Sequence, residues 1–376
     1  MERLNFETLE QAVAPVFREM QRYGLYVNRK AWVETIEVCR TEMLKYQKLA
    51  MDCLSGPQHL DLFGESSLNL NSPADVAGAL SKCTNPAEAQ ASLDRYREMA
   101  KLVQTYGATF IEFIDPISWR IHAHFESTGA STGRVSCHRP NLQNLPSDTR
   151  FQACLSAPAG RAIVRADYAA CELRILADFS GDASFLKAFE DSEDLHTQVA
   201  INLFGSPTYR EQAKAINFGI IYGMGSKSLA ASLQVTQNQA EEWLKQYFKK
   251  HPRIKAYLDW SVQEAYAKGY AQTRLGRRLA LNTSQDISRV AKNMPIQGTA
   301  AELAKLAMVW VHRRLSQDFQ EAVLVNMIHD ELVVECQEAD QQQVAEVLVY
   351  EMERAQKRIC PRVQPKAESV ILPYRP

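Results

Sequence analysis

The sequence lacks the features that define several large classes of protein. Its eight cysteines are scattered and never form a Cys-x-x-Cys pair, which argues against a zinc site or a disulfide framework and favours reduced, buried thiols. No apolar run approaches the length of a membrane-spanning helix, and the acidic, polar start is unlike a signal or transit peptide. No G-x-x-x-x-G-K-[ST] motif occurs, so a Walker A phosphate loop is excluded. We therefore expect a soluble cytoplasmic protein that binds no membrane.

A strong net charge is also lacking, but the charges are unevenly distributed. The formal charge of the 376-residue, 42.5 kDa chain is −1. Residues 210–292 contain fourteen basic and six acidic side chains, whereas residues 321–353 contain nine acidic ones and no Lys or Arg. One segment could hold phosphates and the other cations, although two ordinary solvated faces would give the same pattern. The length and ordinary composition predict a large core divided into two or three subdomains.

Glycine is absent from residues 322–336, the segment around which the rest of the chain is organised. Two runs rich in Val, Ile and Leu meet at His329-Asp330-Glu331, which predicts two half-buried strands joined by a tight turn. Such a turn normally contains Asn-Gly, Asp-Gly or another glycine at a positive φ. Two adjacent carboxylates repel each other unless a cation lies beside them, so the pair predicts half of a metal site. The alternative is an acidic hairpin tip that faces solvent.

A second carboxylate follows a buried strand in residues 162–179. The apolar run that starts at Ala162 ends at Asp167, where a helix-like stretch begins. An unpaired buried charge is strongly unfavourable, so a carboxylate at this place is paired or binds a metal. We expect Asp167 to be the partner of Asp330. The alternative is a helix N-cap, because Asp is a preferred residue just before a helix.

Residues 209–222 predict a helix with one chemically distinctive stripe. Arg210, Lys214 and Phe218 are spaced by four and therefore lie on one face, with Tyr222 further along the same stripe. Two cations followed by an aromatic ring match a triphosphate with its base or sugar against the ring. The alternative is an exposed basic face whose aliphatic stems cover the core.

Two further segments carry polar groups suited to nucleic acid. Residues 125–146 combine glycines, hydroxyls, amides and arginines, which suit contacts to phosphate, sugar and the minor groove, or a hydrogen-bonded surface loop. A long apolar helix is expected from Ala300 to about Leu315. The preceding Asn293 and Gln297 could donate to base edges, or could cap and brace that helix.

The N-terminal third predicts packing helices without evident chemistry. Across residues 1–118, an apolar helix would end at Gly24, and Asn28 would cap a second helix. A loop-like stretch covers residues 56–70, and a further helix is expected from Pro86 to about Tyr106.

Five motifs in a fixed order make these fragments specific. TGRVSCHRPNLQNLP, DYAACELR, R-x-x-x-K-x-x-x-F-x-x-x-YG, NMPIQGTAAEL and HDE together resemble the polymerase module of family A DNA polymerases, the group of bacterial DNA polymerase I. The resemblance is strong over residues 128–335 and weaker in the helical N-terminal third. It implies an α+β right-hand fold with a thumb, an antiparallel palm sheet and helical fingers. The implied division is a thumb-like region with N-terminal palm-packing helices at 1–118, palm at 119–180 and 291–376, and fingers at 181–290.

The resemblance also implies roles for individual residues. Asp167 and Asp330 would bind two Mg²⁺ ions, for which Mn²⁺ could substitute, and Glu331 would have a secondary catalytic role. Lys214 would bind the triphosphate and protonate the pyrophosphate, and Glu172 would block a ribose 2′-hydroxyl. The nucleotide would be bound by Arg210, Lys214, Phe218, Tyr222, His196, Glu172 and Tyr168. Primer and template would be tracked by Arg134, Asn141, Gln143, Arg289, Asn293, Gln297 and His329.

Departures from the family pattern lead to further expectations. Where the family usually reads DYSQIELR, Ala169, Ala170 and Cys171 replace Ser, Gln and Ile, so fidelity and sugar discrimination are expected to differ while metal binding is retained. A thumb that is short between Leu70 and Tyr106 predicts a weaker grip on the duplex. No exonuclease module precedes the polymerase motifs, so we expect no proofreading in this chain.

The resemblance predicts a DNA-templated DNA polymerase. Its partners would be primer-template DNA and dNTPs, with a processivity factor or a helicase or primase as a candidate protein partner, and the chain would be a monomer of bacterial, phage or mobile-element origin. The alternative function is a catalytically remodelled DNA-binding or scaffolding protein of the same fold. A metal-dependent nuclease is a more distant alternative, because it has no need of the stripe that carries Arg210, Lys214 and Phe218.

Overall fold

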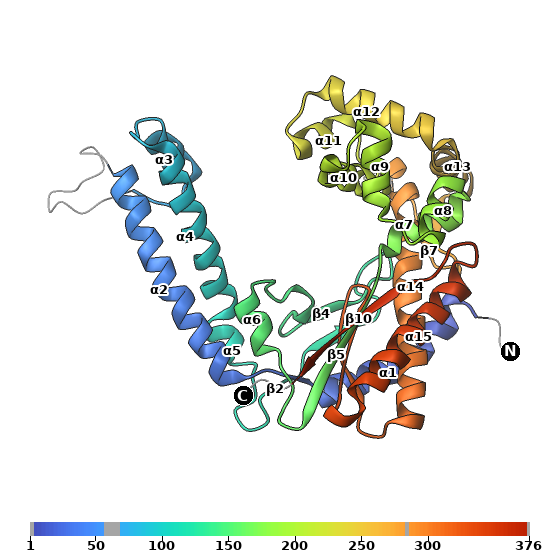
Figure 1. The fold of residues 1–376 in the computed structure, drawn as a ribbon, viewed down its shortest axis with the longest axis horizontal. Coiled ribbons are helices and arrows are strands. Elements are labelled where there is room, and N and C mark those ends of the chain that lie inside the picture. Colours follow the sequence, from blue (N-terminus) through green and yellow to red (C-terminus); the bar gives the residue numbers. More distant parts are fainter. Residues whose placement is uncertain (1–3, 56–67, 283–285, 374–376) are drawn as a thin grey trace.

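The computed structural model describes residues 4–55, 68–282 and 286–373. Figure 1 shows a U-shaped molecule with a four-stranded sheet at its base. One arm consists of α2 (Arg29–Leu54), α3 (Pro73–Leu80) and α4 (Pro86–Tyr106). The predicted loop at 56–70 falls largely on residues 56–67, which lie outside the described ranges. Within those ranges, no helix is both long and apolar enough to cross a lipid bilayer.

Local signals form the first two helices as predicted. α1 (Phe6–Tyr23) begins after Asn5, whose side chain accepts the N–H of Thr8, and it ends at Gly24, where φ is 78°. α2 begins after Asn28, whose side chain accepts the N–H of Ala31. These side chains satisfy N–H groups that the first helical turn leaves without a backbone acceptor. The apolar stripes predicted for both helices are buried.

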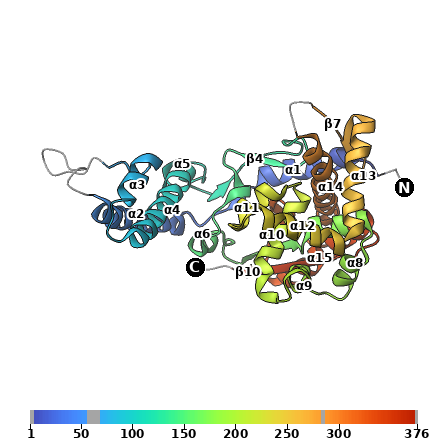
Figure 2. The same ribbon diagram turned by 90° about the horizontal axis from the view of Figure 1, so that it is seen from above.

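The arm formed by α2, α3 and α4 has a small core of its own, made of Ala50, Leu54, Leu68, Leu70, Val76, Ala79, Ala89 and Leu93. At its base, Trp32 stacks on Phe110 of α5 (Ala108–Ile111) and contacts Phe151 of α6 (Thr149–Cys154) edge-on. Figure 2 shows this arm extending away from the other helices. The predicted helical character of the N-terminal third is confirmed, while the domain boundary near residue 118 stays a prediction.

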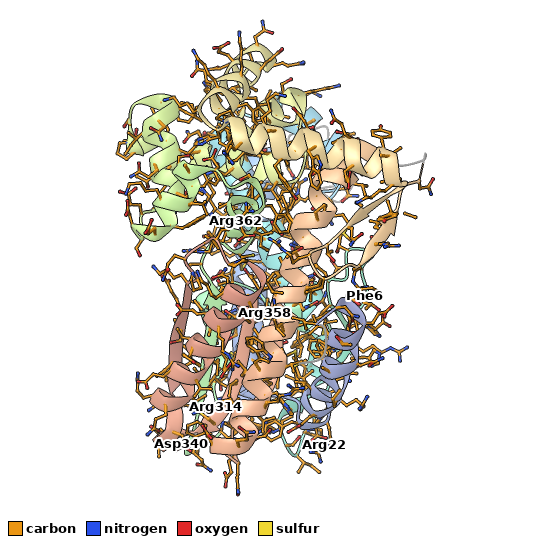
Figure 3. The ribbon with its side chains drawn as sticks, turned by 90° about the vertical axis from the view of Figure 1, so that its right-hand side faces the viewer. Phe6, Arg22, Arg314, Asp340, Arg358 and Arg362 are labelled. Carbon is orange, nitrogen blue, oxygen red and sulfur yellow. The ribbon has the colours of Figure 1, made fainter. Side chains whose placement is uncertain are left out.

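The central sheet is antiparallel, with the order β10 (Ala367–Pro373), β5 (Arg161–Tyr168), β9 (Glu331–Gln337) and β8 (Val323–Ile328). The predicted hairpin is therefore confirmed as β8 and β9, and the predicted strand before Asp167 as β5. In this register Asp167 lies opposite Glu331. Figure 3 shows α1 and α15 (Gln341–Ile359) on either side of α14 (Ile287–Asp318). The sheet thus joins carboxylates that are more than 160 residues apart in sequence.

The helix expected at 300–315 is longer than predicted. α14 begins after its N-cap Asp286 and runs through Pro295 to Asp318, so Asn293 and Gln297 lie inside the helix and cannot cap its start. Proline inside a helix removes one backbone hydrogen bond and costs about 3 kcal/mol, which is why the sequence favoured a break there. Eighteen residues of α14 are buried, and this burial outweighs the local cost.

The second arm is helical. It consists of α7 (Cys171–Ser180), α8 (Ala183–Glu190), α9 (Leu195–Phe204), α10 (Arg210–Ile221), α11 (Ser226–Leu233), α12 (Gln237–Lys250) and α13 (Pro252–Lys268). Short antiparallel pairs are β1 (Leu25–Tyr26) with β2 (Arg120–Ile121), β3 (His124–Glu126) with β4 (Ser136–His138), and β6 (Tyr270–Gln272) with β7 (Arg278–Ala280). The helix predicted at 209–222 is confirmed as α10, which places its basic stripe on the second arm.

Candidate active site

Two carboxylates meet where β5 ends and β8 turns into β9. Asp167 is the second-last residue of β5, and Asp330 lies in the turn next to Glu331. Asp167 is exposed, yet the protein around it partly desolvates its carboxyl group and raises its pKa, and the charges of Asp330 and Glu331 raise that pKa further. Burial also raises the pKa of Asp330, and Glu172 adds to the effect. Across the described part of the chain, neither aspartate forms an ion pair with a Lys, Arg or His. No salt bridge within that part of the chain therefore neutralises the pair, although the charge of Arg165 partly offsets the rise in the pKa of Asp167 and that of Arg134 partly offsets the rise in the pKa of Asp330.

The turn itself is strained at His329. Its φ is 57°, in the left-handed region that a two-residue turn requires and that glycine normally supplies. His329 is exposed, and Ile328 pairs with Glu331 directly below it. A non-glycine residue in this conformation costs about 1 kcal/mol and is typical of functional sites. The sequence indicated this conflict between turn and residue type, and the structure confirms it.

Glu331 differs from the two aspartates because an arginine holds it. Arg165, two residues before Asp167 on the same face of β5, donates Nε and Nη2 to the Glu331 carboxylate at 3.1 and 2.7 Å. Its charge is paired in a salt bridge, whereas Asp167 and Asp330 form no salt bridge with a described residue. Arg165 was missed at the sequence level, although its position two residues before Asp167 was a signal that could have identified it.

The donor set at this site fits a divalent cation such as Mg²⁺. Carboxylate oxygens are the ligands that Mg²⁺ prefers, and a cation between Asp167 and Asp330 would remove the repulsion that raises both pKa values. Glu331 is occupied by Arg165, so the two aspartates are the carboxylates left to hold a metal.

A cavity of about 360 Å³ adjoins Asp330. It brings together many of the predicted residues, since its lining consists of Arg134, Val135, Gln143, Tyr168, Ala170, Cys171, Glu172, Phe218, Tyr222, Ala300, Ala301, Met327, His329 and Asp330. Phe218 and Tyr222 stack with their ring centroids 6.3 Å apart and form one wall. A flat aromatic wall next to a carboxylate pair suits a base or sugar beside a phosphate-bound metal.

Glu172 and Arg134 form an ion pair inside this cavity. The Glu172 side chain is 9% exposed, and its burial raises its pKa, an effect that Arg134 partly offsets. The second oxygen of Glu172, Oε2, is buried without a hydrogen-bond partner. Arg134 therefore holds the carboxylate in place at the cavity wall, beside the side chain of Tyr222.

Phe218 of the α10 stripe lines this cavity, whereas Arg210 and Lys214 of the same stripe do not. Arg210 donates Nε to Asp194 at 2.7 Å and also pairs with Glu211, whereas Lys214 is exposed and forms no ion pair with any residue that the structure describes. His196 is buried, which lowers its pKa, and its Nδ1 lies 3.0 Å from Nδ2 of Asn217. A phosphate bound by Arg210 would have to replace Asp194, the N-cap residue of α9, which the sequence analysis missed.

Among the residues predicted to bind the nucleotide, Tyr168 has the side chain that is least able to contact it. Its hydroxyl donates to the carbonyl of Met352 at 2.7 Å and its ring is buried in the core. Only its main chain could therefore contact a nucleotide in the cavity. Its role stays a prediction in that narrower form.

The predicted DNA-contacting residues form two groups. Gln143 donates Nε2 to the carbonyl of Met327 at 3.3 Å, next to the hairpin turn, and its N–H donates to Asn141. Arg289, Asn293 and Gln297 follow each other at intervals of four, so α14 aligns them on one stripe. Asn293 Oδ1 is buried without a hydrogen-bond partner. These contacts position the side-chain amides, and DNA binding by these residues stays a prediction.

Comparison with known proteins adds an independent line of support. The sequence matches the family described as DNA polymerase family A over residues 58–369. It is 31% identical to DNA polymerase I of Caldicellulosiruptor bescii, over 93% of this chain and 45% of that protein. It is 32% identical to DNA polymerase I of Bacillus caldotenax, over 92% and 43%, and 36% identical to thermostable DNA polymerase I of Thermus aquaticus, over 69% and 33%.

The fold has a solved counterpart. The POL domain of Pol1 from M. smegmatis, in complex with DNA primer-template and dNTP, superposes with a TM-score of 0.81 at 26% identity. The match covers 96% of this chain and 69% of that one. This likeness confirms the predicted fold class. The chain spans less than half the length of the curated relatives that it matches.

Proposed function

The chain belongs to DNA polymerase family A, and from that premise we propose that it adds dNTPs to the 3′-hydroxyl of a primer on a DNA template. The observation that carries the proposal is the pair Asp167 and Asp330, which forms no salt bridge with a described residue and whose Asp330 lines a cavity with an aromatic wall. The solved neighbour was bound to primer-template and dNTP, which supports these two partners. Nothing in the geometry favours the alternative of a DNA-binding scaffold, since binding alone needs no unpaired carboxylates.

Asp167 and Asp330 would hold the two Mg²⁺ ions, and Mn²⁺ could replace them because it accepts the same oxygen ligands. Bound metals would lower the pKa of the primer hydroxyl and neutralise charge on the leaving pyrophosphate. Glu331 would act indirectly: paired with Arg165, it keeps the end of β9 opposite Asp167. Its catalytic role is therefore secondary.

The nucleotide would be held from three sides. Arg210 would exchange Asp194 for triphosphate oxygens, His196 would support this end of α10, and exposed Lys214 would bind the phosphates and donate a proton to the pyrophosphate. Phe218 and Tyr222 would contact the base and sugar. The main chain of Tyr168 would complete the cavity.

Glu172 would select the sugar. Arg134 fixes its carboxylate at the cavity wall, where a 2′-hydroxyl would meet it. A buried carboxylate oxygen at contact distance excludes an added hydroxyl group by volume. This arrangement supports DNA synthesis over RNA synthesis.

DNA would be followed by a set of residues on both sides of the hairpin turn. Arg134, Asn141, Gln143 and His329 come from the region of the turn, and Arg289, Asn293 and Gln297 come from α14. Amides and arginines can donate to the purine N3 and pyrimidine O2 acceptors, which every base pair presents in the minor groove. Such contacts would track the duplex without reading its sequence.

The arm of α2, α3 and α4 would serve as the thumb, with residues 1–118 as the thumb-like region. Residues 119–180 and 291–376 would form the palm, and residues 181–290 the fingers. We further propose that the chain acts as a monomer in the cytoplasm, in keeping with its bacterial relatives.

Primer extension tests the proposal. The full chain would be given a labelled primer on a DNA template, Mg²⁺ and dNTPs, with Asp330→Ala as the control. Templated extension that is lost in the variant is the expected result, because a metal contributes several kcal/mol to the transition state, about 10³-fold in rate. If the wild-type chain binds the duplex and adds no nucleotide, the remodelled scaffold is the better description.

A further inference from the structure

We propose that the β3–β4 hairpin binds one transition-metal ion of the Zn²⁺ class through His124, Glu126 and His138. The three residues lie outside the carboxylate pair and outside the lining of the cavity beside it. The proposal therefore does not depend on the proposed polymerase function.

Strand pairing brings the three side chains together. β3 and β4 are antiparallel, and His124 lies directly opposite His138. Glu126 follows His124 by two residues and so points to the same face of β3. The two imidazole rings have centroids 4.7 Å apart, with an angle of 60° between their planes.

The distances suit a shared metal. One ligand atom from each residue, a ring nitrogen or a carboxylate oxygen, lies within 4.8 Å of the other two. In a tetrahedral zinc site with ligands at about 2.0–2.2 Å, the ligand atoms are about 3.3 Å apart. Small rotations of two exposed side chains and one half-buried one would close this difference.

These ligand atoms are not engaged elsewhere. In the described ranges, the side chains of His124, Glu126 and His138 form no hydrogen bond or ion pair. Four of the other described histidines do have such partners: His122 lies against Gln21, His196 against Asn217, His251 against Ser184, and His312 against Glu19. The hairpin therefore gathers two imidazoles and one carboxylate whose lone pairs are all available.

The chemistry of these ligands selects the metal. Two imidazole nitrogens and one carboxylate oxygen are typical of Zn²⁺ and of Co²⁺, Ni²⁺ or Cu²⁺, whereas Mg²⁺ prefers oxygen ligands alone. Three protein ligands leave a coordination position for water. The cysteine spacing argued against a zinc site. That argument concerns cysteine ligands close together in the sequence, and it does not apply to His and Glu ligands that strand pairing brings together. The chain would thus hold two metal sites of different chemistry.

The position of the hairpin suggests what such a metal would do. Residues 127–135 connect β3 to β4 and include Arg134, which holds Glu172 in the cavity. The ladder that closes this connection has three residue pairs, and His124–His138 is the pair at its open end. A metal there would join the two strands and restrict the connection, because it crosslinks the ladder beyond its last hydrogen bonds.

Calorimetric titration of Zn²⁺ into the tag-free, chelator-treated full chain tests the site. Millimolar Mg²⁺ would be present throughout to occupy the carboxylate pair. We expect one Zn²⁺ per chain and a higher melting temperature in Zn²⁺. His124→Ala and His138→Ala should each weaken binding by at least about 100-fold, because removing even a group that supports a metal ligand costs 10–100-fold. Glu126→Gln should weaken it less.

Two matched variants serve as controls. His122→Ala removes a neighbouring imidazole that lies outside the cluster, and Asp330→Asn alters the carboxylate pair; both should leave Zn²⁺ affinity unchanged. Circular dichroism would establish that each variant folds. With Cu²⁺ as a spectroscopic probe, nitrogen hyperfine structure from two imidazoles in the wild-type chain should decrease to one in His124→Gln.

Three outcomes would overturn the proposal. The first is no stoichiometric Zn²⁺ binding to the wild-type chain. The second is an equal loss of affinity in His122→Ala and His138→Ala. The third is a Cu²⁺ spectrum that does not change when His124 is replaced. Loss of primer extension in any variant would not bear on the site, so the two proposals fail independently.

Discussion

The two ends of the β5–β9 ladder treat carboxylate charge in opposite ways. At one end Glu335 is fully buried, and it accepts two hydrogen bonds at 2.8 Å from Arg120, one from Arg161 and one at 2.9 Å from Tyr23. At the other end Asp167 is exposed and Asp330 is half-buried, and neither forms an ion pair with a Lys, Arg or His of the described chain. The same two strands thus carry a structural carboxylate that the protein neutralises and a carboxylate pair that is left for a ligand. In this ladder, the absence of an ion-pair partner, rather than burial, distinguishes the functional carboxylates from the structural one.

Replacing Asp167 with Asn tests the comparison most strongly. We expect primer extension to fall by about 10³-fold or more, because the metal contributes several kcal/mol to the transition state. Stability without metal should not fall, since the change removes repulsion from Asp330. Rates and urea unfolding curves would be measured on the same samples.

Glu331→Gln is the matched control for that variant. Its carboxylate is held by Arg165, so extension should fall less than in Asp167→Asn, while stability should fall. An equal loss of activity in the two variants would show that the distinction between paired and unpaired carboxylates at this end is wrong.

At the opposite end, Glu335→Ala should destabilise the fold by about 3–5 kcal/mol, because it leaves the largely buried Arg120 without its carboxylate partner and Arg161 with only the exposed Glu321. Glu321→Ala is the control: Glu321 also pairs with Arg161 but is 62% exposed, so its loss should cost less than about 1 kcal/mol. Chemical denaturation measures both. A small effect of Glu335→Ala would remove the structural half of the comparison.

Glu172 lies between the two cases, because it has one cation partner and one buried oxygen without a partner. Glu172→Ala should raise ribonucleotide incorporation by about 100-fold, the discrimination that one excluded hydroxyl commonly supplies. Single-nucleotide incorporation with matched dNTP and rNTP measures it. Unchanged sugar selectivity would show that the carboxylate is structural, like Glu335.

The pH dependence of stability sharpens the comparison further. The folded-state pKa values of Asp167 and Asp330 are raised above the ordinary value of about 4. The two carboxyl groups therefore stabilise the fold fully when the pH is below about 4, where they are protonated in both the folded and the unfolded chain. This stabilisation is lost as the pH rises through the raised folded-state pKa values of Asp167 and Asp330. With chelator present, wild-type stability should fall relative to a variant with Asn at both positions across this window. Added Mg²⁺ should abolish the difference.

The smallest expected effect concerns Ala170, which precedes α7 with a φ of 53° and lines the cavity. Ala169→Ser with Ala170→Gln would place polar groups where the wild type has none. We expect a change of a few-fold in misinsertion, because a single added polar contact contributes about 1 kcal/mol. Ala170→Gly, which relieves the left-handed conformation without adding a polar group, is the control. Identical misinsertion rates in all three proteins would make the alanines neutral.

Much of the molecule could be predicted from sequence because its signals are local. Gly24 ends the first helix, two runs rich in Val, Ile and Leu form the β8–β9 hairpin, and spacing by four aligns Arg210 with Phe218. Each signal rests on residues within a few positions of one another, where the helical and strand periods apply. The five ordered motifs then indicated the fold class, which the comparisons confirm.

The pairings that decide function depended on the tertiary structure. Arg165 reaches Glu331 across 166 residues, Arg210 reaches Asp194 between two helices, and Arg134 reaches Glu172 from a loop. α14 continues through Pro295 because burial outweighs a local helix-breaking signal. The His124–His138 pair exists only once β3 and β4 are in register. Sequence periodicity specifies which face a side chain occupies, whereas its partner is decided by which distant segment packs against that face.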